Sequence, residues 1–113
     1  TVTLGGDDAL FRREETFGPL IPVFPFETEA EVMEKANDSE FGLASYLFTR
    51  DLDRAMRIGR HIEAGMIGIN TGLISTAVAP FGGVKSSGYG REGSIHGIDE
   101  YVDVKQVTLA LKA

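Results

Sequence analysis

Three short apolar runs, separated by two amphipathic stretches, dominate the middle of the chain. The runs LIPVFPF, LASYLFT and MIGIN occupy residues 20–26, 43–49 and 66–70 and are typical of buried strands. Strands that alternate with helices over short connections form parallel sheets with right-handed crossovers. The pattern therefore predicts an α/β fold with a β-α-β-α-β parallel sheet. The prolines of the first run lack an N–H group, so that strand should pair irregularly.

Two helices are predicted between these strands. Thr28 and Glu31 form a capping box, which predicts a helix that ends at about residue 36. Asp51 is the expected cap of a second helix, which extends to Ala64 and is followed by Gly65. The apolar residues of the second helix fall on one face at helical spacing: Leu52, Ala55, Met56, Gly59 and Ile62.

The two ends of the chain each predict a further strand. Residues 1–4 form a short one, and residues 103–111 form the closing one after a short helix at 94–101. Parallel strands need cover on both faces, and two helices supply only part of it. We therefore expect more chain or a partner to complete the fold. The sequence begins with Thr1 rather than Met, so we expect that an N-terminal part is missing.

The organisation changes after Asn70, where glycine becomes frequent. Ten of the 14 glycines lie between Gly59 and Gly97, and residues 71–93 have neither helical nor strand periodicity. Long loops of this kind are usually functional or disordered, and the aromatic residues in this one favour an ordered, functional loop. Its GxGxxG pattern at 88–93 follows no strand, so a dinucleotide fingerprint is not indicated.

Composition excludes several classes of function. The chain has 113 residues, which fits one domain. It contains no cysteine, so it has no disulfide, thiolate zinc site or thiol nucleophile. The formal charge of −6 argues against nucleic acid, and the two histidines lack metal-ligand spacing. No apolar run is long enough for a membrane helix and no basic leader is visible, so we expect a cytoplasmic protein.

Two polar motifs have alternative interpretations. The sequon Asn37-Asp38-Ser39 is interpreted as an unmodified helix end. Glu14 and Glu15 precede the turn at residues 17–19. Either both are simply exposed carboxylates, or one of them is placed to accept hydrogen bonds from the hydroxyls of a sugar. Residue types alone do not decide between the two.

Three motifs together resemble the aldehyde dehydrogenase superfamily. Residues 14–19, EETFGP, resemble the family's EExFGP motif, and residues 41–44 resemble its FGLA segment. Residues 80–92, PFGGVKSSGYGRE, resemble the signature PFGGxKxSGxGRE. The motifs occur in family order and at family spacing, and the resemblance covers essentially the whole chain. It corresponds to the C-terminal part of a family chain.

The resemblance implies an oxidoreductase that converts an aldehyde to an acid with NAD or NADP. In this family a cysteine attacks the aldehyde, hydride passes to the nicotinamide, and water hydrolyses the thioester. The cysteine and the general-base glutamate lie upstream of these motifs, so the isolated chain is expected to be inactive. The resemblance implies that residues 1–102 end the catalytic domain and that residues 103–113 form an oligomerisation strand.

The motif matches also imply site residues. Glu15 is similar to the glutamate that accepts hydrogen bonds from the nicotinamide ribose, and Phe17 to the aromatic residue at the same end of the cofactor. Phe81 matches an aromatic residue of the substrate channel, and Glu92 matches a glutamate near the active-site water path. An ionised carboxylate can accept two ribose hydroxyls, each contributing ~1.5–3 kcal/mol.

A further segment narrows the class of substrate that the resemblance implies. Residues 70–75, NTGLIS, resemble the NTGxIS segment of succinate-semialdehyde dehydrogenases, where the serine matched by Ser75 binds the substrate carboxylate beside upstream arginines. This implies oxidation of a short carboxylated semialdehyde, succinate semialdehyde first, although glutarate-semialdehyde enzymes share the pattern. The alternative is that Ser75 caps its own loop.

The resemblance also implies a homo-oligomer. The family strand matched by 103–111 pairs with another subunit's sheet, and the acid matched by Asp103 bonds arginines, one of them matched by Arg91. Family enzymes usually carry glutamate at the position of Asp103, and the shorter side chain weakens the expectation of that ion pair. The expected partners are the upstream part of the same polypeptide, the semialdehyde and further copies of the chain.

Two other functions compete with this one. The 113 residues can instead be a stand-alone, non-catalytic interaction or oligomerisation module of the same fold. A small nucleotide-binding domain is the third possibility, and the failed fingerprint argues against it. An in-frame upstream segment that contains cysteine would favour the enzyme over the module.

Overall fold

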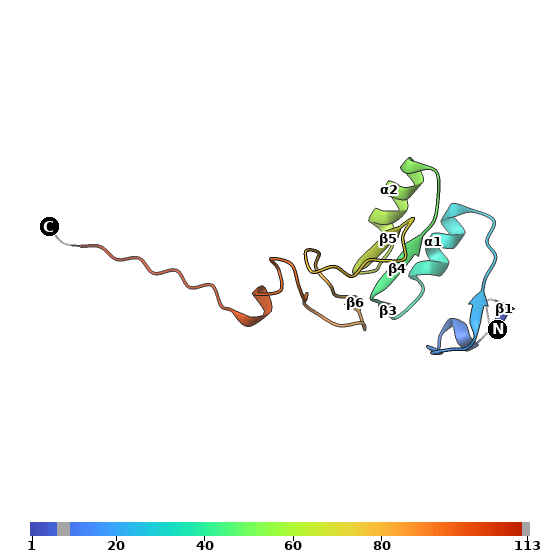
Figure 1. Ribbon diagram of the computed structural model, residues 1–113, viewed down its shortest axis with the longest axis horizontal. Helices are drawn as coiled ribbons and strands as arrows, with labels where there is room; N and C mark the ends of the chain where they lie inside the picture. The colour runs from blue at the N-terminus through green and yellow to red at the C-terminus, as the bar shows by residue number, and fades with distance from the viewer. Residues whose placement is uncertain (7–9, 112–113) are drawn as a thin grey trace.

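The computed structural model describes residues 1–6 and 10–111. The elements follow one another from the N-terminus to the C-terminal tail (Figure 1). In chain order they are β1 (Val2–Leu4), the 3-10 turn Leu10–Arg12, β2 (Ile21–Val23), α1 (Glu29–Asn37), β3 (Phe41–Gly42), β4 (Ala44–Leu47), α2 (Leu52–His61), β5 (Met66–Ile69), β6 (Val84–Lys85) and the 3-10 turn Asp99–Tyr101.

The described strands form three two-stranded sheets. β1 pairs with β2 and β4 pairs with β5, both in parallel, whereas β3 and β6 are antiparallel. The predicted α/β class with parallel strands is thus confirmed, but the three apolar runs do not share one sheet. In the first run, Pro22 and Pro25 lack an N–H group, so β2 has only three residues and its hydrogen bonds go to the N-terminal segment. Ile21 N donates to Thr1 O at 2.8 Å.

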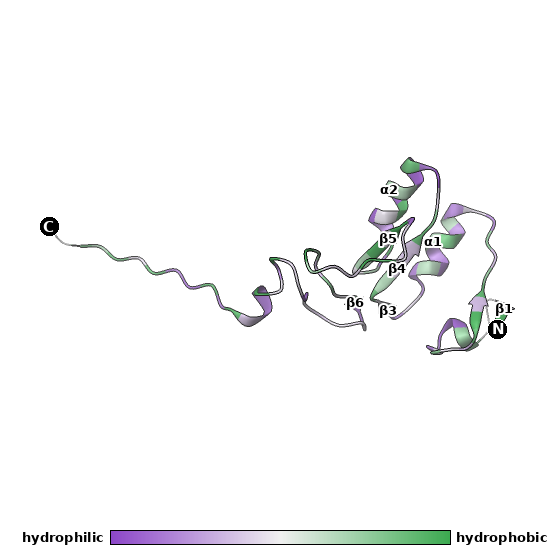
Figure 2. Cartoon of the chain, viewed as in Figure 1, coloured by the Kyte–Doolittle hydropathy of each residue, from purple (hydrophilic) through white to green (hydrophobic). Residues whose placement is uncertain are grey.

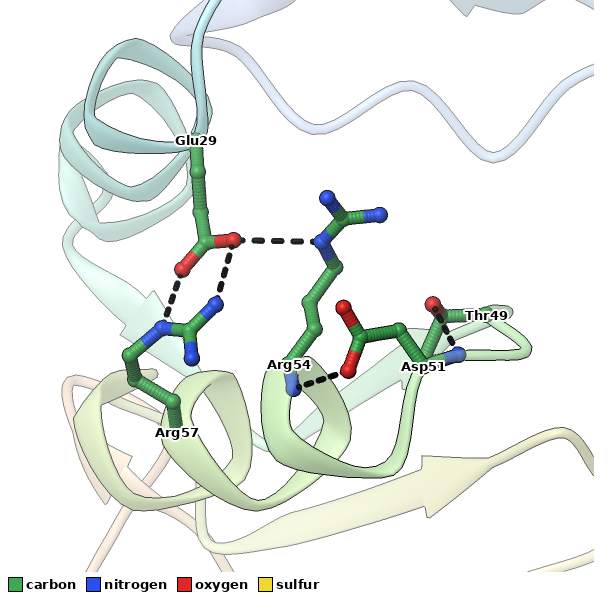
Figure 3. Close-up of polar contacts among 5 residues, drawn as sticks. All are labelled: Glu29, Thr49, Asp51, Arg54 and Arg57. Carbon is green, nitrogen blue, oxygen red and sulfur yellow. Dashed lines mark hydrogen bonds and ion pairs between the residues drawn. The ribbon is translucent and has the colours of Figure 1, made fainter.

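Both helices begin at their predicted caps. Thr28 Oγ1 accepts the Glu31 N–H at 3.1 Å, and Asp51 Oδ1 accepts the Arg54 N–H at 3.0 Å. These bonds satisfy donors that the first turn of a helix cannot pair internally. The cap of α2 is drawn in Figure 3. The sequence signals for helix starts are therefore confirmed by the structure.

Helix α2 ends at His61, three residues before the predicted end. The side chain of Asn37, at the end of α1, donates to His61 O at 3.0 Å and accepts the Glu63 N–H at 2.9 Å. These contacts hold the chain after His61 in an extended conformation, so the helix stops there. Gly65 is therefore not the residue that terminates the helix. It is needed because a Cβ there would collide with Gly82 O.

An ion-pair cluster joins α1 to α2 (Figure 3). Arg57 Nε and Nη2 donate to the two carboxylate oxygens of Glu29 at 2.6 and 2.9 Å, and Arg54 Nε donates to Oε2 at 3.1 Å. The hydrogen bonds from Arg57, followed by those from Arg54, lower the pKa of Glu29 from 4.5 to about 2. The cluster fixes the first turn of α1 against the side of α2.

The core lies between α2 and β5. Its buried apolar residues among those described are Ala55, Ile58 and Met66. Leu52 and Met56, which were predicted to lie on the apolar face of α2, are exposed, and so are the apolar residues of the tail. Figure 2 shows hydrophobic residues along β5 and at intervals in the tail. This much exposed apolar surface agrees with the prediction that more chain or a partner is needed to cover the strands and helices.

The C-terminal region departs most from its prediction. Of the predicted helix at 94–101, only the last turn is helical, as the 3-10 turn Asp99–Tyr101. Residues 102–111 are extended and exposed and run away from the body, without a strand partner among the described residues (Figure 1). The tail gives the chain a longest dimension of 77 Å against 31 and 23 Å. The predicted strand therefore has the extended shape, but it forms no ladder with any other described residue. The last two residues of 103–113 lie outside the described part.

In the part of the chain that the structure describes, neither helix has the length and apolar character needed to span a membrane.

Candidate functional site

The glycine-rich loop is ordered by a closed pair of backbone hydrogen bonds. Phe81 N donates to Glu92 O at 2.8 Å, and Glu92 N donates to Phe81 O at 2.7 Å. This isolated antiparallel bridge brings together two residues that sequence analysis had linked to substrate and water. The bridge closes residues 81–92, the second half of the glycine-rich segment, into a loop.

Arg91 holds this loop from within. Its Nη1 donates to Gly83 O at 2.8 Å and to Gly90 O at 2.7 Å. Bonds from a guanidinium are stronger than those between neutral groups, so they stabilise the tight path of the loop. The predicted ion pair between Arg91 and Asp103 is not among the salt bridges of the described residues, and Asp103 lies exposed in the tail.

The loop residues Phe81, Arg91 and Glu92 line an open cleft of about 330 Å³. Leu43, from the segment between β3 and β4, and Ser87 also line this cleft. Phe81 keeps 38% of its surface exposed, so its ring is available to a ligand. The cleft therefore combines an aromatic face with a nearby carboxylate and glycine backbone.

Glu15 lines a second open cleft, of about 490 Å³. The walls come from the segment around β3, the connection between α2 and β5, and the hydroxyl residues Ser86 and Ser87. Leu43 and Ser87 line both clefts, so the cleft of Glu15 and the cleft of Phe81 are neighbours. A carboxylate with nearby hydroxyls suits a hydroxylated sugar ring, because such groups accept and donate to sugar hydroxyls.

Phe17 and Ser75 line neither cleft. Phe17 is 96% exposed, and Ser75 is exposed on the loop after β5. That loop starts from a defined point, because Asn70 Oδ1 accepts the Thr49 N–H at 2.9 Å and Asn70 Nδ2 donates to Thr49 O at 2.8 Å. Asn70 thereby extends the β4–β5 pairing and sets the direction of the segment that carries Ser75.

Sequence analysis did not identify Lys85 and Asn37 as structurally important. Lys85 Nζ donates to Asn37 O at 2.8 Å and to Ser39 O at 3.0 Å, and it pairs with Glu63 at 2.5 Å. Asn37 was predicted to lie at a helix end, and it is the last residue of α1. Its side-chain amide bonds to the chain after α2. The described residues contain no cluster of three or more acidic, histidine or cysteine side chains able to hold a metal.

Comparison with known proteins identifies the class. Residues 3–107 match the aldehyde dehydrogenase family, and the chain therefore belongs to that family. It is 59% identical to glutarate-semialdehyde dehydrogenase of Pseudomonas aeruginosa over 90% of the chain and 21% of that protein. It is 55% identical to the NADP(+) succinate-semialdehyde dehydrogenase GabD of Escherichia coli over 92% of the chain and 22% of that protein.

Solved structures agree with the fold. A succinate-semialdehyde dehydrogenase from Burkholderia pseudomallei matches with a TM-score of 0.80 and 61% identity, over 83% of this chain and 20% of that one. A mutant of the indole-3-acetaldehyde dehydrogenase AldA from P. syringae, in complex with NAD+, matches with a TM-score of 0.86 and 37% identity, over 92% and 21%. The family therefore includes users of NADP and of NAD. The chain spans about a fifth of the length of these relatives.

Proposed function

We propose that this chain is part of an NAD(P)-dependent dehydrogenase that oxidises a short carboxylated semialdehyde, succinate semialdehyde first. The observation that carries the proposal is identity above one half, over nine tenths of the chain, to enzymes named for succinate and glutarate semialdehydes. Both of these substrates carry a carboxylate at the end opposite the aldehyde. The shared chemistry of the relatives thus points to an anionic aldehyde as the substrate.

Ser75 is the proposed contact to that carboxylate. Its hydroxyl is a hydrogen-bond donor on an exposed loop whose start is fixed by Asn70. A single hydroxyl cannot neutralise a carboxylate, so cationic groups from elsewhere in the enzyme must contribute. Phe81, further along the same loop, is proposed to line the path of the aliphatic part of the substrate.

Glu15 and Phe17 are proposed to receive the nicotinamide end of the cofactor. Glu15 fits this role because it lines an open cleft whose walls also include four serines. When bound, the cofactor supplies the hydride acceptor. The contribution of this chain is to orient the ribose through Glu15 and to offer the exposed ring of Phe17. Glu92, paired with Phe81, is proposed to lie near the path of the hydrolytic water.

Residues 1–102 are proposed to belong to the catalytic domain and residues 103–113 to an assembly strand. Asp103 and Arg91 are proposed to contribute to assembly, with the upstream polypeptide and further copies of the enzyme as partners. Localisation in the cytoplasm stays a prediction. Since the chain contains no cysteine, the thiolate that attacks the aldehyde must come from another part of the enzyme.

The test compares the full-length enzyme with the 113-residue chain. We expect the full-length enzyme to reduce NAD or NADP with succinate or glutarate semialdehyde, as measured by the absorbance of the reduced nicotinamide. The purified chain should show no turnover, with full-length contaminant excluded by mass spectrometry. A full-length enzyme that reduces neither cofactor with any carboxylated semialdehyde would contradict the proposed function.

A further inference from the structure

Lys85 occupies a backbone conformation that lysine rarely adopts. Its φ angle is 55°, in the left-handed region, where glycine or asparagine is the usual residue. The side chain is only 26% exposed, and its ammonium has three partners. A lysine that is kept at a strained position with all its donors in use indicates that the ammonium itself is needed there.

The partners of Lys85 lie at the C-terminal end of α1. Asn37 is the last residue of that helix, so no N–H group within the helix donates to its carbonyl. A cation is favoured at this end because the helix carries partial negative charge there. The carbonyl of Ser39, just beyond, is the second acceptor, and Glu63 adds an ion pair from the chain after α2.

The backbone of Lys85 belongs to the glycine-rich loop. In the β3–β6 pairing it lies opposite Phe41, and the next residue, Ser86, donates its N–H to Glu40 O at 2.9 Å. Ser87 Oγ accepts the Gly42 N–H at 2.9 Å. One short stretch thus docks the loop on the body, and that stretch lies inside the segment closed by the Phe81–Glu92 bridge.

From these contacts we infer that Lys85 is a positioning residue. Its ammonium ties the glycine-rich loop to the end of α1 and so fixes where Phe81 and Glu92 stand in their cleft. The inference deepens the proposed function and rests on it for the consequence to substrate binding. The consequence for the order of the loop follows from the contacts alone.

The test uses the full-length enzyme with Lys85→Met, which keeps a long aliphatic side chain and removes the ammonium. Lys35→Met is the matched control, because the ammonium of Lys35 likewise contacts a carboxylate, Glu31, and a backbone carbonyl, Pro25 O, but is not part of the loop. Amide hydrogen exchange of residues 81–92 measures the order of the loop. Steady-state kinetics give KM for the semialdehyde and for the cofactor separately.

We expect Lys85→Met to speed exchange in residues 81–92 and to raise KM for the semialdehyde by about tenfold, the size expected for a lost charge-assisted hydrogen bond. KM for the cofactor should rise less than KM for the semialdehyde, because Ser86 and Ser87 of the docked stretch also line the cleft of Glu15. Lys35→Met should change neither the exchange nor the two KM values. A merely destabilising substitution would instead lower the active fraction, so that kcat falls while both KM values stay constant.

Two further variants keep the inference open to refutation. Glu63→Gln removes the ion pair but leaves both carbonyl contacts, so its exchange and KM should stay close to wild type. If Lys85→Met does not fold, Lys85→Gln, with a shorter neutral donor, should show the same changes at smaller size. The inference is overturned if the Lys85 variant that folds has the same amide exchange in residues 81–92 and the same KM for the semialdehyde as the wild-type enzyme. If the wild-type enzyme does not turn over a semialdehyde, the proposed function is refuted. The amide exchange of residues 81–92 in the variants still shows whether Lys85 orders the loop.

Discussion

Glu15 lines an open cleft and belongs to no helix or strand, so its side chain is available for binding. In the full-length enzyme we expect Glu15→Gln to lower kcat/KM for the cofactor about 10–100-fold, since lost hydrogen bonding of ~1.4–2.8 kcal/mol has this effect. The melting temperature should change little, because Glu15 lies outside the core. Unchanged kinetics together with a collapsed melting temperature would mean that Glu15 is structural.

Ser75 gives a prediction about substrate charge. Ser75→Ala should reduce kcat/KM for succinate semialdehyde more than for an uncharged aldehyde of similar length. A neutral hydrogen bond contributes ~0.5–1.5 kcal/mol and one to a charged group ~1.5–3, so the carboxylated substrate has more to lose. Steady-state kinetics with both aldehydes provide the measurement. Equal losses for the two substrates would remove Ser75 from the carboxylate site.

Single residues also mark the limit of what the sequence reveals. Cap residues such as Thr28 and Asp51 act on groups three residues away, so their roles can be predicted locally. Lys85 and Asn37 act on groups far along the chain, and nothing near them in sequence indicates those partners. Gly65 was assigned to a helix end, whereas its actual constraint comes from the approach of Gly82.

Between the two helices, the cluster around Glu29 predicts a dependence of stability on pH. The pKa of Glu29 is lowered from 4.5 to about 2, first through its hydrogen bonds with Arg57. The ionised carboxylate therefore stabilises the fold fully above about pH 4.5, and this contribution is lost as the pH falls towards 2. An NMR titration of the side-chain carboxyl should give a midpoint well below the ordinary range.

Two substitutions test this link between the helices. In wild type, protonation of Glu29 lowers the free energy of unfolding as the pH falls from 4.5 to 2. Glu29→Gln should lack this part of the decrease, as measured by denaturant unfolding at each pH. Glu34→Gln, at an exposed position on the same helix, should leave the pH profile as in wild type. The same profile in Glu29→Gln and wild type would show that the cluster does not couple the helices.

At the level of elements, helix starts were predictable but strand pairing was only partly so. The parallel neighbours β4 and β5 follow from a short helical crossover. The partner of β2 is β1, across a connection without periodicity, and β3 with β6 are two-residue strands whose pairing joins distant motifs. Strands this short carry no alternation to detect, so their partners are set by tertiary contacts rather than by local pattern.

For the whole molecule, the apolar surface left open agrees with the shortness of the chain relative to its relatives. The buried apolar residues of the described part are few, whereas α2, several strands and the tail expose large apolar side chains. On the proposed function, the rest of the enzyme covers the sheets and helices. The shortness of the chain relative to its relatives also explains why the site was only partly predictable. The motifs identified Phe81 and Glu92, which lie together. On the proposed function, the groups that complete both clefts come from the rest of the enzyme.

The tail gives the last prediction. Residues 102–111 form an exposed, extended segment that has no strand partner among the described residues, and the free backbone groups of such a segment readily pair with another strand. Beyond Lys105 its more apolar face is formed by Val107, Leu109 and Leu111. We expect that deleting residues 104–113 from the full-length enzyme yields smaller or aggregating species in light scattering, because the strand that joins the copies is lost. An unchanged oligomer mass with normal solubility would show that the tail does not assemble the enzyme.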